Sequence, residues 1–424
     1  MKLNKAEKIN GVIFPPGDKS ISHRVALISA LSTGENLIEN FLIADDTLST
    51  LNCLKNLGVE IEFSDKLRIK GVGLKGFKKP DSILDAGNSG TTIRLLSGIL
   101  AGQNFDSEIT GDNSLRRRPM MRIVKPLKKM GAKIEASENG TPPLKIYGVE
   151  NLHAIEYELE IPSAQVKSCL IFAGLYTDGK TRIIEKIQTR DHTERLLGLK
   201  TFIKDHKKII EIDGGQKIEA RYYFVPNDIS SSAFFIVAGS IIPNSNLVIK
   251  NVGLNPTRTG FIEILKKMGA NIQIENLHEI ANEPVGDVIV RSGKEIELKN
   301  LTLSGDIIPN IIDEIPILAI AGTVAEGKFE VRDALDLRNK ESDRIKAIVV
   351  NLRKMGVDVE EYDDGFAFEG RKKLKGALIE TFNDHRIAMA FSIAGLIADG
   401  ETIIDNPGCV AISFPNFYDI LKRI

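Results

Sequence analysis

The sequence predicts a mixed α/β (α+β) protein made of about six repeated helix-and-strand units. Three observations support this prediction. A chain of 424 residues with 42% hydrophobic content is too long for one ordinary core, so two or three domains are expected. One phrase typical of a helix end recurs along the chain, and a second phrase typical of a strand start recurs between its copies.

The first phrase places two apolar residues three positions apart, shortly before a glycine. A glycine at this point ends a helix, and the alternating residues that follow it indicate a strand. The interval between the second and third copies is about twice the other intervals, so one copy is expected to have diverged near Leu196–His206. The four clear copies lie at 54–59, 127–132, 265–270 and 352–357.

The second phrase is a turn followed by alternating residues, which indicates entry into a strand. Its copies are spaced at roughly 70 residues, which fits six units in the chain. One such glycine would mean little, because glycine is common after helices, but regular recurrence favours a repeat. The copies begin at Gly34, Gly179, Gly327 and Gly400, with weaker ones at Gly102–Gln103 and Pro243–Ser245.

Composition excludes several classes of protein. The formal net charge is −1, which gives no electrostatic footprint for nucleic acid. The three cysteines, Cys53, Cys169 and Cys409, form no CxxC pair, so neither a disulfide framework nor a cysteine zinc site is expected. The first ten residues are polar, and no apolar run approaches the ~18 residues of a membrane span. We therefore expect a cytoplasmic globular protein with no metal, nucleic-acid or membrane partner.

Several helices are predicted to begin with polar or basic residues, one of them over 162–168. Lys19 lies at the start of an apolar helix, where a lysine opposes the helix dipole. Its position is explained by a bound anion held by free backbone N–H groups, or alternatively by a solvent-exposed cation at small cost. The segment 85–94 has glycines and hydroxyls before a helix, which fits either a phosphate-binding nest or a loop with a good N-cap. It is not a Walker A loop, because no Gly-Lys-Ser/Thr follows at the required spacing.

Three consecutive arginines precede Pro119. Proline is favoured at the first position of a helix, so Arg118 is predicted at a helix entrance, where a guanidinium can grip carboxylate or phosphate. Arg116 and Arg117 are predicted to be surface charges. Further on, the spacing of Asp191 and Glu194 predicts a capping box, with Asp191 as N-cap and Glu194 three residues later. His192 is predicted to make a structural hydrogen bond. The capping box does not need Arg190, so this arginine is a candidate for ligand binding.

The second half of the chain adds carboxylates to the cations. Asp313 is flanked by apolar residues, so burial and a raised pKa are expected. Lys340, Glu341 and Arg344 are spaced to pair on one helix, with ordinary surface salt bridges as the alternative. His385 has no second histidine nearby at ligand spacing, so a metal site is not expected.

Together these motifs resemble the 5-enolpyruvylshikimate-3-phosphate (EPSP) synthase family of enolpyruvyl transferases over essentially the whole chain. The forms GNSGTT, SAQVK and RDHTER look like the family's class II branch. The matching stretches, in the family's order, are PGDKSISHR, GNSGTTIRLL, GDNSLRRRPM, PSAQVKS, RDHTER, NPTRTG, DEIP, NKESDR, DHRIAMA and CVAISFPNF.

The resemblance implies two similar domains, 15–227 and 1–14 plus 228–424. Each would hold three βαβαββ repeats with buried helices, an inside-out α/β barrel, and the active site would lie in the cleft between the domains. The chain would cross between the domains at two Pro-containing stretches, 14–17 and 224–228. The family uses no metal and no organic cofactor, and a monomer is expected.

The resemblance also implies an activity: transfer of the enolpyruvyl group of phosphoenolpyruvate to the 5-hydroxyl of shikimate 3-phosphate, with release of phosphate, in the shikimate pathway of aromatic amino acid biosynthesis. Asp313 is expected to deprotonate the hydroxyl, with Glu341 and Lys19 as candidates for proton transfer at the methylene carbon. The shikimate 3-phosphate ligands implied are Lys19, Ser20, Arg24, Ser163, Ala164, Gln165, Arg190, Asp313 and Lys340. The phosphoenolpyruvate ligands implied are Lys19, Gly90, Arg118, Gln165, Arg344 and Arg386.

One residue departs from the family pattern, and two other functions would fit parts of the sequence. Ile412 stands where some family members have a lysine that contacts phosphoenolpyruvate, which implies weaker affinity or compensation by other cations. A related transferase acts on UDP-N-acetylglucosamine and carries a cysteine in a loop corresponding to 111–119, where this chain has none. A non-catalytic polyanion-binding protein would not be expected to place carboxylates such as Asp313 beside its cations. The family resemblance also implies a glyphosate target.

Overall fold

The computed structural model describes residues 1–424, and the chain divides into two compact units. The first unit comprises Met1–Pro16, Pro226–Glu279 and Pro284–Ile424. The second unit comprises Gly17–Val225 together with Ile280–Glu283. The chain contains six small sheets, three formed within each unit, which matches the six repeats predicted from the sequence.

The second unit has three four-stranded sheets of one topology. In each sheet the first two strands are parallel, and the third pairs antiparallel with both of its neighbours. The sheets are β14(Tyr222–Phe224)-β3(Thr33–Glu39)-β5(Leu67–Val72)-β4(Glu60–Phe63), β6(Leu84–Asp85)-β7(Ser107–Thr110)-β9(Leu144–Tyr147)-β8(Lys133–Glu135) and β10(Glu156–Glu158)-β11(Lys180–Glu185)-β13(Lys207–Asp213)-β12(Lys200–Lys204). The helices are α1(Lys19–Leu31), α2(Asp45–Asn56), α3(Gly90–Leu100), α4(Met121–Lys129), α5(Ala164–Gly174) and α6(His192–Leu197).

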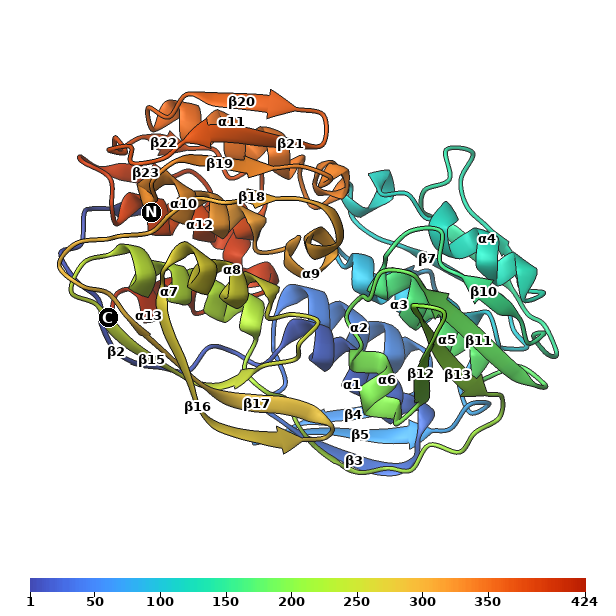
Figure 1. Cartoon of the computed structure of the whole chain (residues 1–424). Coiled ribbons are helices and arrows are strands. Elements are labelled where there is room, and N and C mark those ends of the chain that lie inside the picture. The colour runs from blue at the N-terminus through green and yellow to red at the C-terminus, as the bar shows by residue number, and fades with distance from the viewer. The chain divides into compact units, whose positions relative to one another are not determined.

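The first unit repeats this plan with one smaller sheet. Its sheets are β16(Asn271–Ile280)-β17(Glu283–Arg291)-β15(Asn246–Gly253)-β2(Asn10–Ile13), β18(Thr302–Leu303)-β19(Lys328–Val331)-β21(Gly365–Glu369)-β20(Val359–Tyr362) and β1(Lys2–Leu3)-β23(Thr402–Ile404)-β22(Leu378–Ile379). Its helices are α7(Ile229–Ile241), α8(Gly260–Met268), α9(Ile308–Ile311), α10(Ile315–Val324), α11(Arg344–Lys354), α12(His385–Gly395) and α13(Phe417–Leu421). Figure 1 labels most of these elements.

The chain passes from the first unit to the second at Pro16–Gly17 and back at Val225–Pro226, directly after one strand in each case. β2 precedes α1 in the chain but pairs in parallel with β15 of the first unit, whereas β14 precedes α7 but pairs in parallel with β3 of the second unit. Each of these strands therefore ends one unit's sheet just before the chain enters the other unit. The sequence repeats did not predict which strands pair at these two crossings, because pairing depends on contacts across the chain rather than on local pattern.

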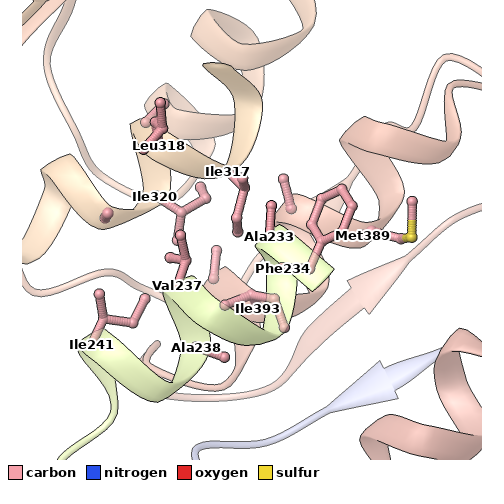
Figure 2. Close-up of a cluster of buried hydrophobic side chains, with 14 of the residues drawn as sticks. Ala233, Phe234, Val237, Ala238, Ile241, Ile317, Leu318, Ile320, Met389 and Ile393 are labelled. Carbon is pink, nitrogen blue, oxygen red and sulfur yellow. The ribbon is translucent and has the colours of Figure 1, made fainter. Parts of the chain in front are cut away.

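The helices form the interior and the sheets carry the exposed faces. Every residue of α7 and of α12 is buried, and such helices are apolar all round rather than amphipathic. Figure 2 shows one such cluster, in which side chains of α7, α10 and α12 pack together. The labelled members include Phe234, Val237, Ile320, Met389 and Ile393.

The predicted helix-end glycines are confirmed. Gly58, Gly131, Gly269 and Gly356 follow α2, α4, α8 and α11 with positive φ, a conformation that glycine adopts without strain. The diverged copy expected near Leu196–His206 is the junction of α6 and β12, where Gly198 is the left-handed C-cap.

No single helix is long and apolar enough to cross a membrane. One pair of consecutive helical segments, Gly305–Ile311 and Ile315–Val324, is long and apolar enough when taken together, but the two segments are bent by 109° relative to each other.

Candidate active site

Lys19 begins α1 of the second unit and is held by a carboxylate. Its Nζ lies 2.8 Å from Asp46 Oδ2, and its side chain is only 15% exposed. Asp18 caps the same helix by accepting a hydrogen bond from the Ile21 N–H at 2.8 Å. The solvent-exposed alternative for Lys19 is therefore wrong, because Asp46 fixes the ammonium group at the helix start.

The start of α3 is surrounded by guanidinium groups. Ser89 is the N-cap and its Oγ accepts from the Thr92 N–H at 3.1 Å, so the N-cap interpretation of this motif is confirmed. A Cβ built on Gly90 would lie 3.2 Å from Nη1 of both Arg118 and Arg94. Glycine therefore leaves space between two cations and the free N–H groups of a helix start, which is suited to an anion.

Arg118 is buried, but it does not lie at the start of a helix as predicted. Helix α4 begins at Met121, so the prediction that Pro119 occupies its first position is wrong. A short 3-10 helix, 115–117, precedes Arg118, whose extended backbone is the conformation favoured before a proline. Its Nη2 donates to Asn88 Oδ1 at 2.8 Å and to Ser114 Oγ at 3.2 Å. Arg116 and Arg117 are exposed, as predicted.

Gln165 connects the starts of α5 and α3. Its Oε1 accepts from Arg94 Nη1 at 2.5 Å, and its Nε2 donates to Thr91 Oγ1 at 3.0 Å. Ser163 is the N-cap of α5, and Ala164 is the first residue of that helix. Ser163, Ala164 and Gln165 thus lie on one polar helix start, as the sequence predicted.

Arg24 lies one turn into α1 and is 3% exposed. Its Nε donates to Thr193 Oγ1 at 2.7 Å, its Nη2 to Ser168 Oγ at 2.9 Å and its Nη1 to the Ser20 carbonyl oxygen at 2.9 Å. The side chain therefore ties α1 to α5 and α6, and Ser20 lies in the first turn of the same helix.

The predicted capping box at α6 is wrong. Asp191 does occupy the N-cap position, but its side chain makes no cap hydrogen bond and instead accepts from Arg195 Nε at 2.9 Å. Glu194 turns toward Lys167, with Oε1 2.8 Å from Nζ, because a buried lysine requires a partner more than the helix start requires a second cap. His192 lies 2.7 Å from Glu283 Oε1 through Nδ1, which confirms its structural hydrogen bond.

Arg344, in the first unit, is surrounded by three carboxylates. Its Nε lies 2.8 Å from Asp384 Oδ2, its Nη2 2.5 Å from Glu341 Oε2 and its Nη1 3.2 Å from Asp313 Oδ1. The guanidinium is 1% exposed. Burial alone would lower the pKa of Arg344, but the carboxylates of Asp384, Glu341 and Asp313 outweigh it and raise that pKa.

Asp313 contacts a second guanidinium. Arg386 Nη2 lies 3.6 Å from Asp313 Oδ2, and Arg386 Nη1 donates to the Asp313 carbonyl oxygen at 3.1 Å. The Asp313 side chain is 15% exposed, so it is partly buried rather than sealed in the core. Asp313 thus lies between two guanidinium groups at the edge of the buried interior.

Lys340 does not share a helix with its predicted neighbours. Asp343 is the N-cap of α11 and accepts from the Lys346 N–H at 3.0 Å, so the helix begins only at Arg344. Lys340 follows a 3-10 helix, 335–339, in an extended conformation and lies 3.4 Å from Asp336. The predicted pairing of Glu341 with Arg344 is present, but it spans the helix start.

Three participants were missed at the level of sequence. Arg94 lies four residues after Gly90 on α3, Asp46 is near the start of α2, and Asp384 caps α12 by accepting from the Arg386 N–H at 2.9 Å. Asp384 carried a usable signal, because an aspartate directly before a helical pattern is a typical N-cap. Ile412, at the departure from the lysine pattern, packs against the hydrophobic core of the first unit.

Each unit thus offers a chemically distinct set of groups. In the second unit, helix starts, Lys19, Arg94 and Arg118 supply cations and N–H donors suited to phosphate or carboxylate. In the first unit, Arg344 and Arg386 accompany Asp313 and Glu341, which adds carboxylates that can move protons. No group of three or more His, Cys, Asp or Glu side chains is placed to hold a metal ion.

Residues 3–421 match the family described as EPSP synthase (3-phosphoshikimate 1-carboxyvinyltransferase). This chain belongs to the EPSP synthase family. A 3-phosphoshikimate 1-carboxyvinyltransferase of Thermodesulfovibrio yellowstonii is 50% identical, over 100% of this chain and 99% of the relative. That of Petrotoga mobilis is 49% identical, over 100% of this chain and 99% of the relative.

Solved structures agree with this assignment to the EPSP synthase family. The EPSP synthase of Acinetobacter baumannii superposes with a TM-score of 0.86 at 43% identity, covering 99% of this chain and 97% of that one. The enolpyruvyl transferase NikO of Streptomyces tendae has a TM-score of 0.76 at 15% identity, covering 100% of this chain and 96% of that one, and so shows the shared fold alone. The predicted α/β repeat fold and family are therefore confirmed.

Proposed function

We propose that this chain transfers the enolpyruvyl group of phosphoenolpyruvate to the 5-hydroxyl of shikimate 3-phosphate. The observation that carries the proposal is the family match over residues 3–421, which contains every polar cluster described above. In the reaction, the hydroxyl oxygen bonds to the central carbon of phosphoenolpyruvate while the methylene carbon gains a proton. The tetrahedral adduct then loses a proton from that carbon and expels phosphate, which restores the enol double bond.

In the second unit we assign residues at helix starts to phosphate and carboxylate recognition. Lys19, Ser20, Arg24, Ser163, Ala164, Gln165 and Arg190 are the proposed ligands of shikimate 3-phosphate. Gly90, Arg118, Gln165 and Lys19 are the proposed ligands of phosphoenolpyruvate. The proximity of the Arg118 and Arg94 guanidiniums to Gly90 supports this assignment, because they would neutralise a dianion there.

In the first unit we assign Asp313 as the base that removes the hydroxyl proton. Glu341 and Lys19 are the proposed proton-transfer groups at the methylene carbon. Arg344 and Arg386 are assigned to phosphoenolpyruvate, and Lys340 to shikimate 3-phosphate. The contact of Asp313 with both arginines supports this assignment, because it places a carboxylate beside the cations assigned to the anionic donor.

We also propose that residues 15–227 and 1–14 plus 228–424 are the two domains, that the protein is a cytoplasmic monomer, and that it is a glyphosate target. The division into two units at Pro16–Gly17 and Val225–Pro226, directly after β2 and β14, supports boundaries close to these positions. Residues of both domains would have to act on the same pair of substrates.

The function is tested by measuring phosphate release with the purified chain. Release is expected only when shikimate 3-phosphate and phosphoenolpyruvate are both present, with one phosphate per enolpyruvyl product. Release with UDP-N-acetylglucosamine in place of shikimate 3-phosphate would favour the related transferase. Binding of both anions without any phosphate release would favour a non-catalytic anion-binding protein.

A further inference from the structure

A buried ion cluster lies behind the loop that carries Arg190. Lys167 Nζ, on α5, lies 2.9 Å from Glu185 Oε2 at the end of β11 and 2.8 Å from Glu194 Oε1 on α6. The three side chains are 0%, 0% and 3% exposed. No step of the proposed reaction uses any of them, so their burial needs another explanation.

The cluster is balanced in charge. Lys208, on β13, lies 3.7 Å from Glu194 Oε1 and 3.6 Å from Asp191 Oδ2, and Arg195 donates to Asp191. Three cations therefore accompany three carboxylates. Burial alone would lower the pKa of Lys167, but Glu194 and Glu185 outweigh it and raise that pKa, so the ammonium group stays charged inside the protein.

The cluster fixes the residue before Arg190. Glu185 Oε1 accepts from the Thr189 N–H at 3.2 Å and from Thr189 Oγ1 at 2.5 Å. Lys167 Nζ donates to the Thr189 carbonyl oxygen at 3.3 Å. Both backbone polar groups of Thr189 are thus held by the ion pair, which leaves little freedom for the peptide that leads into Arg190.

The same lysine lies on the helix that begins with Ser163. The Lys167 N–H donates to the Ser163 carbonyl oxygen at 3.0 Å, so the two residues are one turn apart. The next residue, Ser168, lies 2.7 Å from Thr193 Oγ1 on α6 through its Oγ, and both hydroxyls contact Arg24. The start of α5 and the Arg190 loop are therefore joined through adjacent residues of one helix.

We propose that Lys167 is a positioning residue that sets the geometry between the start of α5 and the Arg190 loop, and so determines recognition of the phosphate group of shikimate 3-phosphate. This inference rests on the proposed function, which assigns Ser163, Gln165 and Arg190 to that substrate. The physical reason is that a rigid support is needed to hold several ligands of one phosphate within a fraction of an ångström.

The test compares the affinity of Lys167→Met for shikimate 3-phosphate with its affinity for shikimate, which lacks the phosphate, by calorimetric titration. A misplacement of about 1 Å can cost roughly 100-fold, so a loss of about 10- to 100-fold is expected for shikimate 3-phosphate. The affinity for shikimate should change by less than about threefold. An equal loss of affinity for both ligands, which leaves the ratio of their affinities unchanged, would overturn the proposal. A merely structural role would change the folded fraction of the protein and not its preference for the phosphorylated ligand.

Two further variants complete the test. Lys167→Met/Glu185→Gln keeps the cluster balanced in charge and retains an oxygen for the Thr189 N–H, so it should fold even if the single variant does not, and it should show the same loss of discrimination. Lys250→Met is the control: it removes a partly buried lysine whose Nζ lies 2.7 Å from Asp287 Oδ2 in the first unit, and it should leave the ratio unchanged. A wild-type protein that does not prefer shikimate 3-phosphate over shikimate would overturn the proposed function itself.

Discussion

Asp313 combines partial burial with two guanidinium neighbours, Arg344 and Arg386. Replacement by asparagine keeps its size and its ability to bond a hydroxyl, but removes the group that accepts a proton. We expect Asp313→Asn to lower kcat by roughly 10²–10⁴-fold, while the KM for shikimate 3-phosphate changes far less. Steady-state kinetics on protein shown to be folded by circular dichroism checks this. A near-wild-type kcat in the variant would show that Asp313 only positions the substrate and does not accept its proton.

Gly90 has room for a ligand because it has no side chain. A methyl group there would come within 3.2 Å of the Nη1 atoms of Arg118 and Arg94, so it would crowd both cations and any anion between them. We expect Gly90→Ala to raise the inhibition constant of glyphosate roughly tenfold or more, and the KM for phosphoenolpyruvate less, because glyphosate is the longer molecule. Inhibition curves at matched phosphoenolpyruvate saturation measure this, and equal inhibition constants for parent and variant would exclude Gly90 from the pocket.

At the scale of elements, α3 and α5 approach closely through a glycine. A Cβ built on Gly98 would lie only 2.1 Å from the Cys169 carbonyl oxygen, and backbone atoms cannot rotate away as side chains do. We expect Gly98→Ala to lower the free energy of unfolding by at least about 1–3 kcal/mol. The urea midpoint measures the change. Gly293→Ala is the control: its Cβ would have only the Glu295 carbonyl oxygen nearby, at 3.6 Å, so its midpoint should stay close to wild type.

His23 joins three helices of the second unit by a chain of hydroxyls. Its Nδ1 lies 2.7 Å from Thr50 Oγ1, which lies 2.7 Å from Thr92 Oγ1, which donates to the N-cap Ser89 at 2.8 Å. Burial, together with the nearby positive charges of Lys19 and Arg24, holds the pKa of His23 well below its usual value of 6.5. The folded protein therefore excludes a proton that the unfolded chain binds.

The lowered pKa of His23 makes the free energy of unfolding fall as the pH is lowered. The contribution of neutral His23 to stability is fully present above about pH 6.5 and is lost as the pH falls below that value, by at most about 1.4 kcal/mol per pH unit. We expect His23→Asn to have a flatter dependence of unfolding free energy on pH between roughly 6.5 and 5. Urea unfolding at several pH values measures both slopes, and parallel slopes for the two proteins would contradict the assignment.

At the scale of the whole molecule, substrate binding should be visible as stability. A ligand that binds only the folded state raises the unfolding free energy by about 2.7 kcal/mol at 100 times its Kd. We expect shikimate 3-phosphate to raise Tm, and shikimate to raise it less at the same concentration, if the helix starts of the second unit bind the phosphate as proposed. Thermal scans with each ligand make the comparison, and an equal rise with both would argue against a phosphate site there.

The sequence alone predicted the six repeats and the helix-end glycines, because each repeat is a local pattern of helix, turn and strand. It also placed Lys19, Gly90 and Gln165 at helix starts, since caps and preceding turns are local features. Where it failed, at Pro119 and at the capping box of Asp191 and Glu194, local preferences were outweighed by distant partners. Glu194 is the clearest case, because its partner Lys167 lies on another helix.

The tertiary structure decided everything that depends on pairing across the chain. The pairing of β2 with β15 and of β14 with β3 is one case, because hydrophobic alternation does not specify which strands pair. The surroundings of Arg344 combine Asp313, Glu341 and Asp384, which no spacing in the sequence brings together. The residues determined the kinds of charge available, and the packing of buried helices determined which charges meet, because a buried charge is stable only beside a partner.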